Sequence, residues 1–277
     1  MVLIGKISAE QNPHFVIESL RNGTNSLGMT RRLLWDIMSS TSPGNSCAPS
    51  FCAAISSTDG VEVIEAAMRS QLQDPTVQVD GCRILHNVCL SRDESARALL
   101  EQDSGVVAIL KAMSAHCKDP FVCLAGSTAL SQLMLCDKIF SETTLEQCAN
   151  CLIRAISTHE SDFNVAAKSI AALKNMLPDD AVQERIMGQG LMPVVLNIMT
   201  SFEKTMTVQE EGCGLIEKIS KNGQHRARMD LDRIGSLIIV AIKNFRSGYC
   251  IVHLIPFCRY FNNNNSSLSD CSHGTTC

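Results

Sequence analysis

Cysteine and histidine are the first residues in this chain whose types and spacing could do chemistry. Cys148 and Cys151 form a CxxC pair, and His116, Cys117 and Cys123 lie close together along the chain. A structural zinc site needs four convergent ligands, usually from two such pairs, and only one CxxC is present. A thioredoxin-type redox pair needs a strand–helix–strand setting, which the helical patterns below do not offer. We therefore expect no metal site and no redox site.

Motifs typical of enzymes do not occur. The sequence contains no glycine-rich phosphate loop after a strand, no Gly-x-Ser-x-Gly and no His-Glu-x-x-His. No constellation of acid, base and nucleophile suggests a reaction. We expect a protein that is not an enzyme and that needs no cofactor.

Composition favours a helical chain that does not bind nucleic acid and does not span a membrane. Of the 277 residues 45% are hydrophobic and only 4% aromatic, which suits close-packed helices. The net charge of −4 supplies no basic field for nucleic acid. The most apolar tracts, Ser236–Ala241 and Tyr249–Phe261, are shorter than the roughly 20 residues that span a bilayer.

The fourteen cysteines indicate a reducing compartment. The opening MVLIGKISAE is too short and too polar for a secretory signal, and most cysteines sit at apolar positions of helical patterns, where a free thiol acts as a small hydrophobe. We expect a cytoplasmic protein, with the nucleus as the alternative.

A helix at Asp74–Leu90 introduces a repeat. Asp74 can cap its first turn, Pro75 suits the first helical position, and the pattern returns three more times. One apolar column has intervals of 45, 43, 43 and 43 residues: Met68, Met113, Ile156, Met199 and Ile242. Others in the same register are Val77, Val122, Val165 and Val208; Leu85, Leu130, Leu173 and Ile216; and the small residues Gly81, Gly126, Ser169 and Gly212.

Each repeat is predicted to hold three helices. The first is short (Glu94–Glu101, Ser141–Gln147, Asp180–Met187) and ends at a glycine turn. The second follows (Val61–Gln71, Val106–His116, Cys151–His159, Met192–Phe202, Ser236–Phe245), and the third begins at the Asp-Pro or its equivalent. Stacked neighbours would bury the apolar stripe that no single helix can bury alone.

Three regions divide the chain. Residues 1–59 read as a degenerate first repeat, with helical patterns at 13–22 and 29–40, a Pro/Gly/Ser loop at 41–50 and a short helix at 50–57. Residues 60–245 carry the clear repeats. Residues 246–277 form a non-repeat tail, expected to be partly disordered, and the repeats stop halfway through a unit. This favours a truncated array whose uncapped end could self-associate.

The segment SGVVAILKAMSAHCKDPFVCLAGSTALSQL (Ser104–Leu133) resembles the armadillo family. The resemblance covers about 12–245, most clearly 60–245, with HEAT repeats as the near neighbour. It implies an all-α, right-handed α-solenoid of three-helix repeats. It also extends to armadillo regions that precede leucine-rich repeat kinases.

In armadillo proteins that bind extended peptides, third helices line the groove and an Asn on each holds the peptide backbone. By position, that slot corresponds here to Asp36, Asn87, Gln132, Asn175 and Lys218. The slot four residues earlier, a tryptophan in nuclear-import receptors, holds Arg32, Arg83, Thr128, Ala171 and Gly214. The resemblance implies a binding groove lined by Arg32, Asp36, Arg83, Asn87, Thr128, Gln132, Asn175 and Lys218.

The expected function is a non-catalytic scaffold that binds a peptide or helical segment of a protein partner in this groove. The two arginines would favour an acidic segment. Two alternatives stay open: a regulatory or targeting module of a larger, kinase-related protein, and a nuclear-transport receptor, which the missing tryptophans disfavour.

Overall fold

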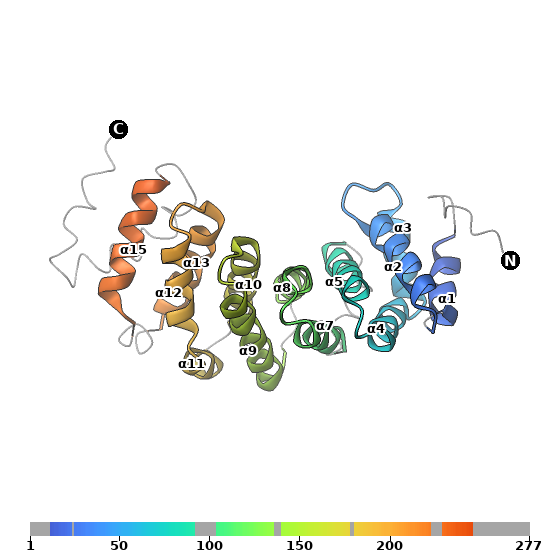
Figure 1. Ribbon diagram of the computed structural model, residues 1–277, viewed down its shortest axis with the longest axis horizontal. Helices are drawn as coiled ribbons and strands as arrows, with labels where there is room; N and C mark the ends of the chain where they lie inside the picture. The colour runs from blue at the N-terminus through green and yellow to red at the C-terminus, as the bar shows by residue number, and fades with distance from the viewer. Residues whose placement is uncertain are drawn as a thin grey trace. The chain divides into compact units, whose positions relative to one another are not determined.

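The computed structural model describes residues 12–23, 25–91, 104–135, 140–177, 180–222 and 229–245. Every regular element in these ranges is an α-helix and none is a strand, so the all-α prediction is confirmed (Figure 1). No helix in these ranges combines the length and the apolar character that crossing a bilayer requires. The predicted helix at 94–101 and the tail at 246–277 lie outside the described residues.

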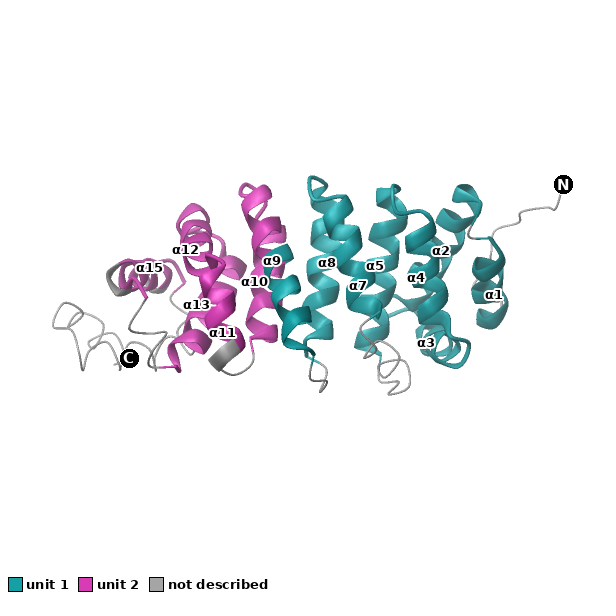
Figure 2. Ribbon diagram, turned by 90° about the horizontal axis from the view of Figure 1, so that it is seen from below, with its two compact units in different colours: residues 1–151 teal, residues 152–277 magenta. Residues whose placement is uncertain are grey.

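The chain divides into two units, residues 1–151 and 152–277 (Figure 2). The first contains α1 (Pro13–Gly23), α2 (Leu27–Thr41), α3 (Ala48–Ser57), α4 (Gly60–Ser70), α5 (Pro75–Leu90), α7 (Ser104–Ala115) and α8 (Pro120–Leu133). The boundary falls inside α9 (Glu142–Thr158). The second contains α10 (Phe163–Met176), α11 (Asp180–Gly188), α12 (Leu191–Ser201), α13 (Met206–Ser220) and α15 (Leu231–Asn244).

In the first unit the helices form two rows. α1, α4 and α7 pack in succession, and α2, α5 and α8 pack in succession beside them (Figure 1). α3 contacts α1, α2 and α4. The apolar side predicted for α5 packs against the neighbouring helices. Its residues Val77, Ile84, Leu85 and Val88 are each 0% exposed. The candidate residues of the third helices in this unit therefore lie on α2, α5 and α8, and each of these helices packs against the next.

In the second unit α13 packs against both α10 and α12, and α12 also contacts α11 and α15. The repeated apolar positions are again buried, with Val165, Leu173, Val208 and Ile216 each 0% exposed. The same columns thus form the core of both units.

The small-residue column marks a close crossing of second and third helices. A Cβ added to the glycine would lie 2.5 Å from an atom of a buried methionine on the preceding helix, closer than packed atoms approach. The pairs are Gly81 with Met68, Gly126 with Met113 and Gly212 with Met199. In the remaining copy Ser169 stands in place of the glycine and Ile156 in place of the methionine. The larger serine therefore occurs where the methionine side chain is absent.

The third helices start at side-chain caps. Asp74 accepts a hydrogen bond from the N–H of Val77 at 3.0 Å, and Asp119 and Asp162 each accept two from the first turn of their helices. Thr205, at the same position of α13, makes no side-chain capping bond. The cap predicted at Asp74 is confirmed, and it recurs at 119 and 162.

The two cap types offer a matched test in the second unit. We expect Asp162→Ala to lower the free energy of unfolding by about 1 kcal/mol, because the N–H groups of Asn164 and Val165 lose their acceptor. Thr205→Ala should change it by less than about 0.5 kcal/mol. Urea unfolding followed by far-ultraviolet circular dichroism measures both. Equal losses for the two variants would contradict the assignment of the cap.

Several predicted boundaries are wrong. The helices expected at 141–147 and 151–159 are one continuous helix, α9. Before α12 the chain turns at Gly190, whose φ of 85° is in the left-handed region, whereas no glycine lies between Gln147 and Cys151 to stop α9. α15 begins at Leu231 rather than 236, because the Asp230 carboxylate caps it. α2 continues to Thr41 and α3 starts at Ala48, which shortens the predicted loop.

Candidate functional site

The first turn of α5 is held against α2. The Asp74 carboxylate caps α5 and also accepts a hydrogen bond from the guanidinium of Arg31. Burial by itself would raise the pKa of Asp74, but the Arg31 hydrogen bond, the Val77 N–H and the Arg31 charge together hold that pKa below its ordinary value. This contact fixes how the candidate residues of α5 lie relative to α2.

The predicted arginines have different surroundings. Arg32 and Asp36 lie one turn apart on α2, both half-buried, with Arg32 Nε 4.0 Å from Asp36 Oδ2. Burial raises the pKa of Asp36, and the Arg32 charge offsets this in part. Arg83 is exposed on α5. The positive charge predicted for this region is therefore offset on α2 by Asp36, whereas the guanidinium of Arg83 on α5 is exposed to solvent.

Asn87 does not project freely into solvent. It is 7% exposed, and its Nδ2 donates a hydrogen bond to Oγ1 of Thr41, 3.3 Å away at the end of α2. The Thr41 hydroxyl in turn donates to the carbonyls of Ile37 and Met38, at 2.9 Å and 3.1 Å. The amide predicted to contact a partner thus links α2 to α5.

On α8 the two predicted positions are half-buried. The Thr128 hydroxyl donates to the carbonyl of Leu124 at 2.7 Å, one turn back in the same helix. Such a bond occupies the hydroxyl proton and leaves the oxygen able to accept. Gln132, one residue before the end of α8, lies at the same repeat position as Asn87.

In the second unit Asn175 and Lys218 are half-buried on α10 and α13. Lys218 Nζ donates to the carbonyl oxygen of Lys174 at 2.8 Å, and Lys174 Nζ is 2.6 Å from a carboxylate oxygen of Glu211. Burial, with the charges of Lys221 and Lys174, lowers the pKa of Lys218. Lys218 therefore bonds the preceding third helix, as Asn87 does in the first unit.

A cavity of about 460 Å³, called here the Asn87 cavity, opens where α2 and α5 end. Its lining includes Thr41, Pro43, Ala48, Cys52, Asn87 and Leu90. Thr41 and Cys52 are each 2% exposed, whereas Leu90 is 44% exposed. The cavity is thus mostly apolar and has a buried amide in its wall.

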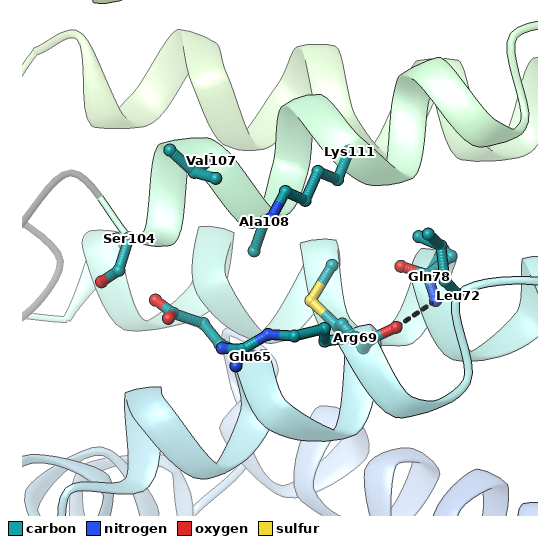
Figure 3. Close-up of a pocket in the computed structure, with 9 residues that line it drawn as sticks. Glu65, Arg69, Leu72, Gln78, Ser104, Val107, Ala108 and Lys111 are labelled. Carbon is teal, nitrogen blue, oxygen red and sulfur yellow. Dashed lines mark hydrogen bonds between the residues drawn. The ribbon is translucent and has the colours of Figure 1, made fainter.

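A second hollow, of about 220 Å³, is lined mainly by residues of α4 and α7, with Leu72 and Gln78 completing the lining (Figure 3). Glu65 is 5% exposed there, and its Oε1 has no hydrogen-bond partner among the described residues. Burial raises the pKa of Glu65, opposed by a hydrogen bond with Ser104 and by the Arg69 charge. Lys111 also lines this hollow from α7 (Figure 3). A buried acid beside Arg69 can accept a hydrogen bond from a small polar group.

Sequence reasoning missed a pair of buried glutamines. Gln78 and Gln209 are each 0% exposed and directly follow the repeated valines. Each side-chain amide donates to two carbonyls at the end of the preceding second helix. These are the carbonyls of Met68 and Gln71 for Gln78, and of Met199 and Phe202 for Gln209. The sequence does carry a signal for this pair, because a glutamine directly follows the repeated valine in two of the repeats.

The cysteine and histidine side chains noted in the sequence lie in or beside the packed helices. Cys148 and Cys151 are both buried, at 0% and 8% exposed. Burial raises the pKa of the Cys82 thiol to about 12. His116 Nε2 donates to the carbonyl oxygen of Leu72 at 2.7 Å, just past the end of α7. Within the described ranges, no group of three or more His, Cys, Asp or Glu side chains could hold a metal ion.

Comparison with known proteins adds no relative: no protein-family model and no curated protein sequence matches this chain.

Proposed function

We propose that this chain is a non-catalytic scaffold of the armadillo type that binds an extended, acidic peptide segment of a protein partner across its third helices. The observation that carries the proposal is the packing of α2 on α5 and of α5 on α8. Equivalent polar positions are thereby repeated on three adjacent helices. These positions carry a carboxylate on α2, amides on α5 and α8 and a hydroxyl on α8. Such groups suit an extended peptide, which presents a backbone donor and acceptor at regular intervals.

Accessible members of this set are the best candidates for contact. Arg83 is exposed, and Thr128 and Gln132 are half-buried. Asn87 and Lys218 already bond the preceding helix, so we assign them mainly to helix spacing. The exposed guanidinium of Arg83 favours an acidic residue in the peptide because it can pair with a carboxylate at two points.

The test is selection of peptides from a random library on the immobilised full chain, followed by affinity measurement in solution. Selected peptides are expected to be enriched in Asp and Glu. The double variant Arg83→Glu, Gln132→Ala should weaken their binding at least about tenfold, equivalent to ~1.4 kcal/mol. Lys111→Glu, an exposed charge reversal on α7 of the same unit, is the matched control and should change affinity less than about twofold.

Two outcomes would reject the proposal: recovery of no binding peptide, or equal losses for the double variant and for Lys111→Glu. Circular dichroism of each variant shows whether a loss of affinity follows from unfolding.

A further inference from the structure

The described part of the wall of the Asn87 cavity is uncharged. Among the described residues that line it there is no Asp, Glu, Lys, Arg or His. A charged occupant would lose its hydration there without gaining an ion-pair partner. The wall therefore favours a neutral occupant.

Small and rigid side chains create the space. Ala48 and Cys52 line it from α3, and Pro43 and Pro49 line it on either side of the start of that helix. Its volume of about 460 Å³ lies within the range of small-molecule sites, roughly 300 to 1,000 Å³. This space exceeds what a single aliphatic side chain fills. Size therefore favours a small molecule.

The Asn87 amide has hydrogen-bonding groups to spare. A carboxamide offers two N–H donors and a carbonyl acceptor. One N–H bonds Thr41, and no described residue bonds the carbonyl oxygen or the second N–H of the side chain. The Thr41 hydroxyl is already committed to the carbonyls of its own helix. A ligand with an adjacent donor and acceptor could engage both remaining groups of Asn87.

We propose that the Asn87 cavity binds a small neutral molecule with an apolar body and one carboxamide or lactam group. The ligand N–H donates to the carbonyl oxygen of Asn87, and the ligand carbonyl accepts from its second N–H. The apolar body lies against Ala48, Cys52 and Leu90. This site does not depend on the proposed peptide function, because it needs neither a peptide nor Arg83, Thr128 and Gln132.

Three test ligands that share one aromatic body separate the contributions. 2-Naphthamide is neutral and both donates and accepts; N,N-dimethyl-2-naphthamide cannot donate; 2-naphthoate is an anion. Titration of the full chain by ligand-observed NMR gives their affinities. 2-Naphthamide should bind at least about tenfold more tightly than either analogue, since each analogue loses a hydrogen bond or carries a charge into an uncharged wall.

Two variants locate the site. Ala48→Phe places a ring in the cavity and should weaken 2-naphthamide binding at least about tenfold. The control Ala108→Phe makes the same change at a half-buried alanine that lines the other hollow, and it should leave the affinity unchanged. Asn87→Ala should reduce the preference for 2-naphthamide over its dimethyl analogue. This ratio is independent of how much of the variant is folded.

The proposal is overturned if 2-naphthamide shows no binding at about 1 mM, the weak limit of a specific small ligand. It is equally overturned if the three ligands bind alike, if Ala48→Phe has no larger effect than Ala108→Phe, or if Asn87→Ala preserves the ligand preference.

Discussion

Replacing Gly81 with serine is expected to lower the free energy of unfolding by about 2 kcal/mol, because a Cβ there would lie 2.5 Å from Cγ and Sδ of Met68. Met68 is 1% exposed, so its side chain has little room to withdraw. Overpacking of this kind forces a rotamer change or a small separation of α4 from α5.

The chain suggests its own compensating change. Ser169 and Ile156 occupy the corresponding positions of another repeat. Adding Met68→Ile to Gly81→Ser should therefore recover about half of the lost stability, and a double-mutant cycle should give a coupling energy of about 1 kcal/mol. Urea unfolding of the wild type, both single variants and the double variant measures this coupling.

Gly28→Ser is the matched control. Gly28 lies on α2, and nothing comes within 4 Å of a Cβ placed there. Serine has the higher helix propensity, so this variant should be neutral or slightly more stable. A coupling energy of zero between positions 68 and 81, or equal losses at positions 28 and 81, would show that the close crossing is not what selects glycine.

Asp80→Asn is expected to raise the free energy of unfolding at pH 7 by about 2 kcal/mol. Asp80 is 3% exposed on α5, and its Oδ2 has no hydrogen-bond partner among the described residues. Burial raises the pKa of Asp80 to about 6, with Arg83 lowering it and Asp74 adding to the increase. The folded protein thus holds an ionised carboxylate at neutral pH at a cost that asparagine avoids.

The pH dependence follows from the sign of this shift. The pKa of Asp80 is higher in the folded protein than its ordinary value of 3.8. Its contribution to stability is therefore fully present below about pH 4 and is lost as the pH rises through about 6. The stabilisation by Asp80→Asn should accordingly be largest at pH 7 and should shrink towards pH 4.

Urea unfolding at pH 4.5, 6 and 7 for the wild type and Asp80→Asn checks this dependence. Glu62→Gln, an exposed change on α4, should alter stability by less than about 0.5 kcal/mol at each pH. If Asp80→Asn shows the same stability difference at every pH, ionisation of Asp80 is not the cause.

Local features of the fold could be predicted from the sequence because they depend on residues close together in the chain. Asp74 and Pro75 predict the start of α5, and apolar spacing predicts which side of α5 is buried. The column of small residues is visible in the sequence, and its glycines lie where second and third helices cross closely. Predicted helix boundaries were wrong where the local signal was ambiguous. At α9, for example, no glycine separates the two helices that were predicted.

The candidate site was less predictable because it depends on neighbours far away in the chain. Position within the repeat identified Asn87 and Lys218, but only packing decided that Asn87 bonds Thr41 and that Lys218 bonds the carbonyl of Lys174. These partners lie about one repeat earlier, and a polar side chain that bonds a neighbouring helix has the same sequence pattern as one that faces a ligand.

By itself, the sequence determined the all-helical class, the Asp74 cap of α5 and the columns that form the core, since each follows from residues close together along one helix. The tertiary structure alone decided the burial of Asp80, the burial of Gln78 and the cavity beside Asn87. Each of these depends on how large the side chains of neighbouring helices are and on how closely those helices approach, and neither quantity is encoded in the pattern of any one helix.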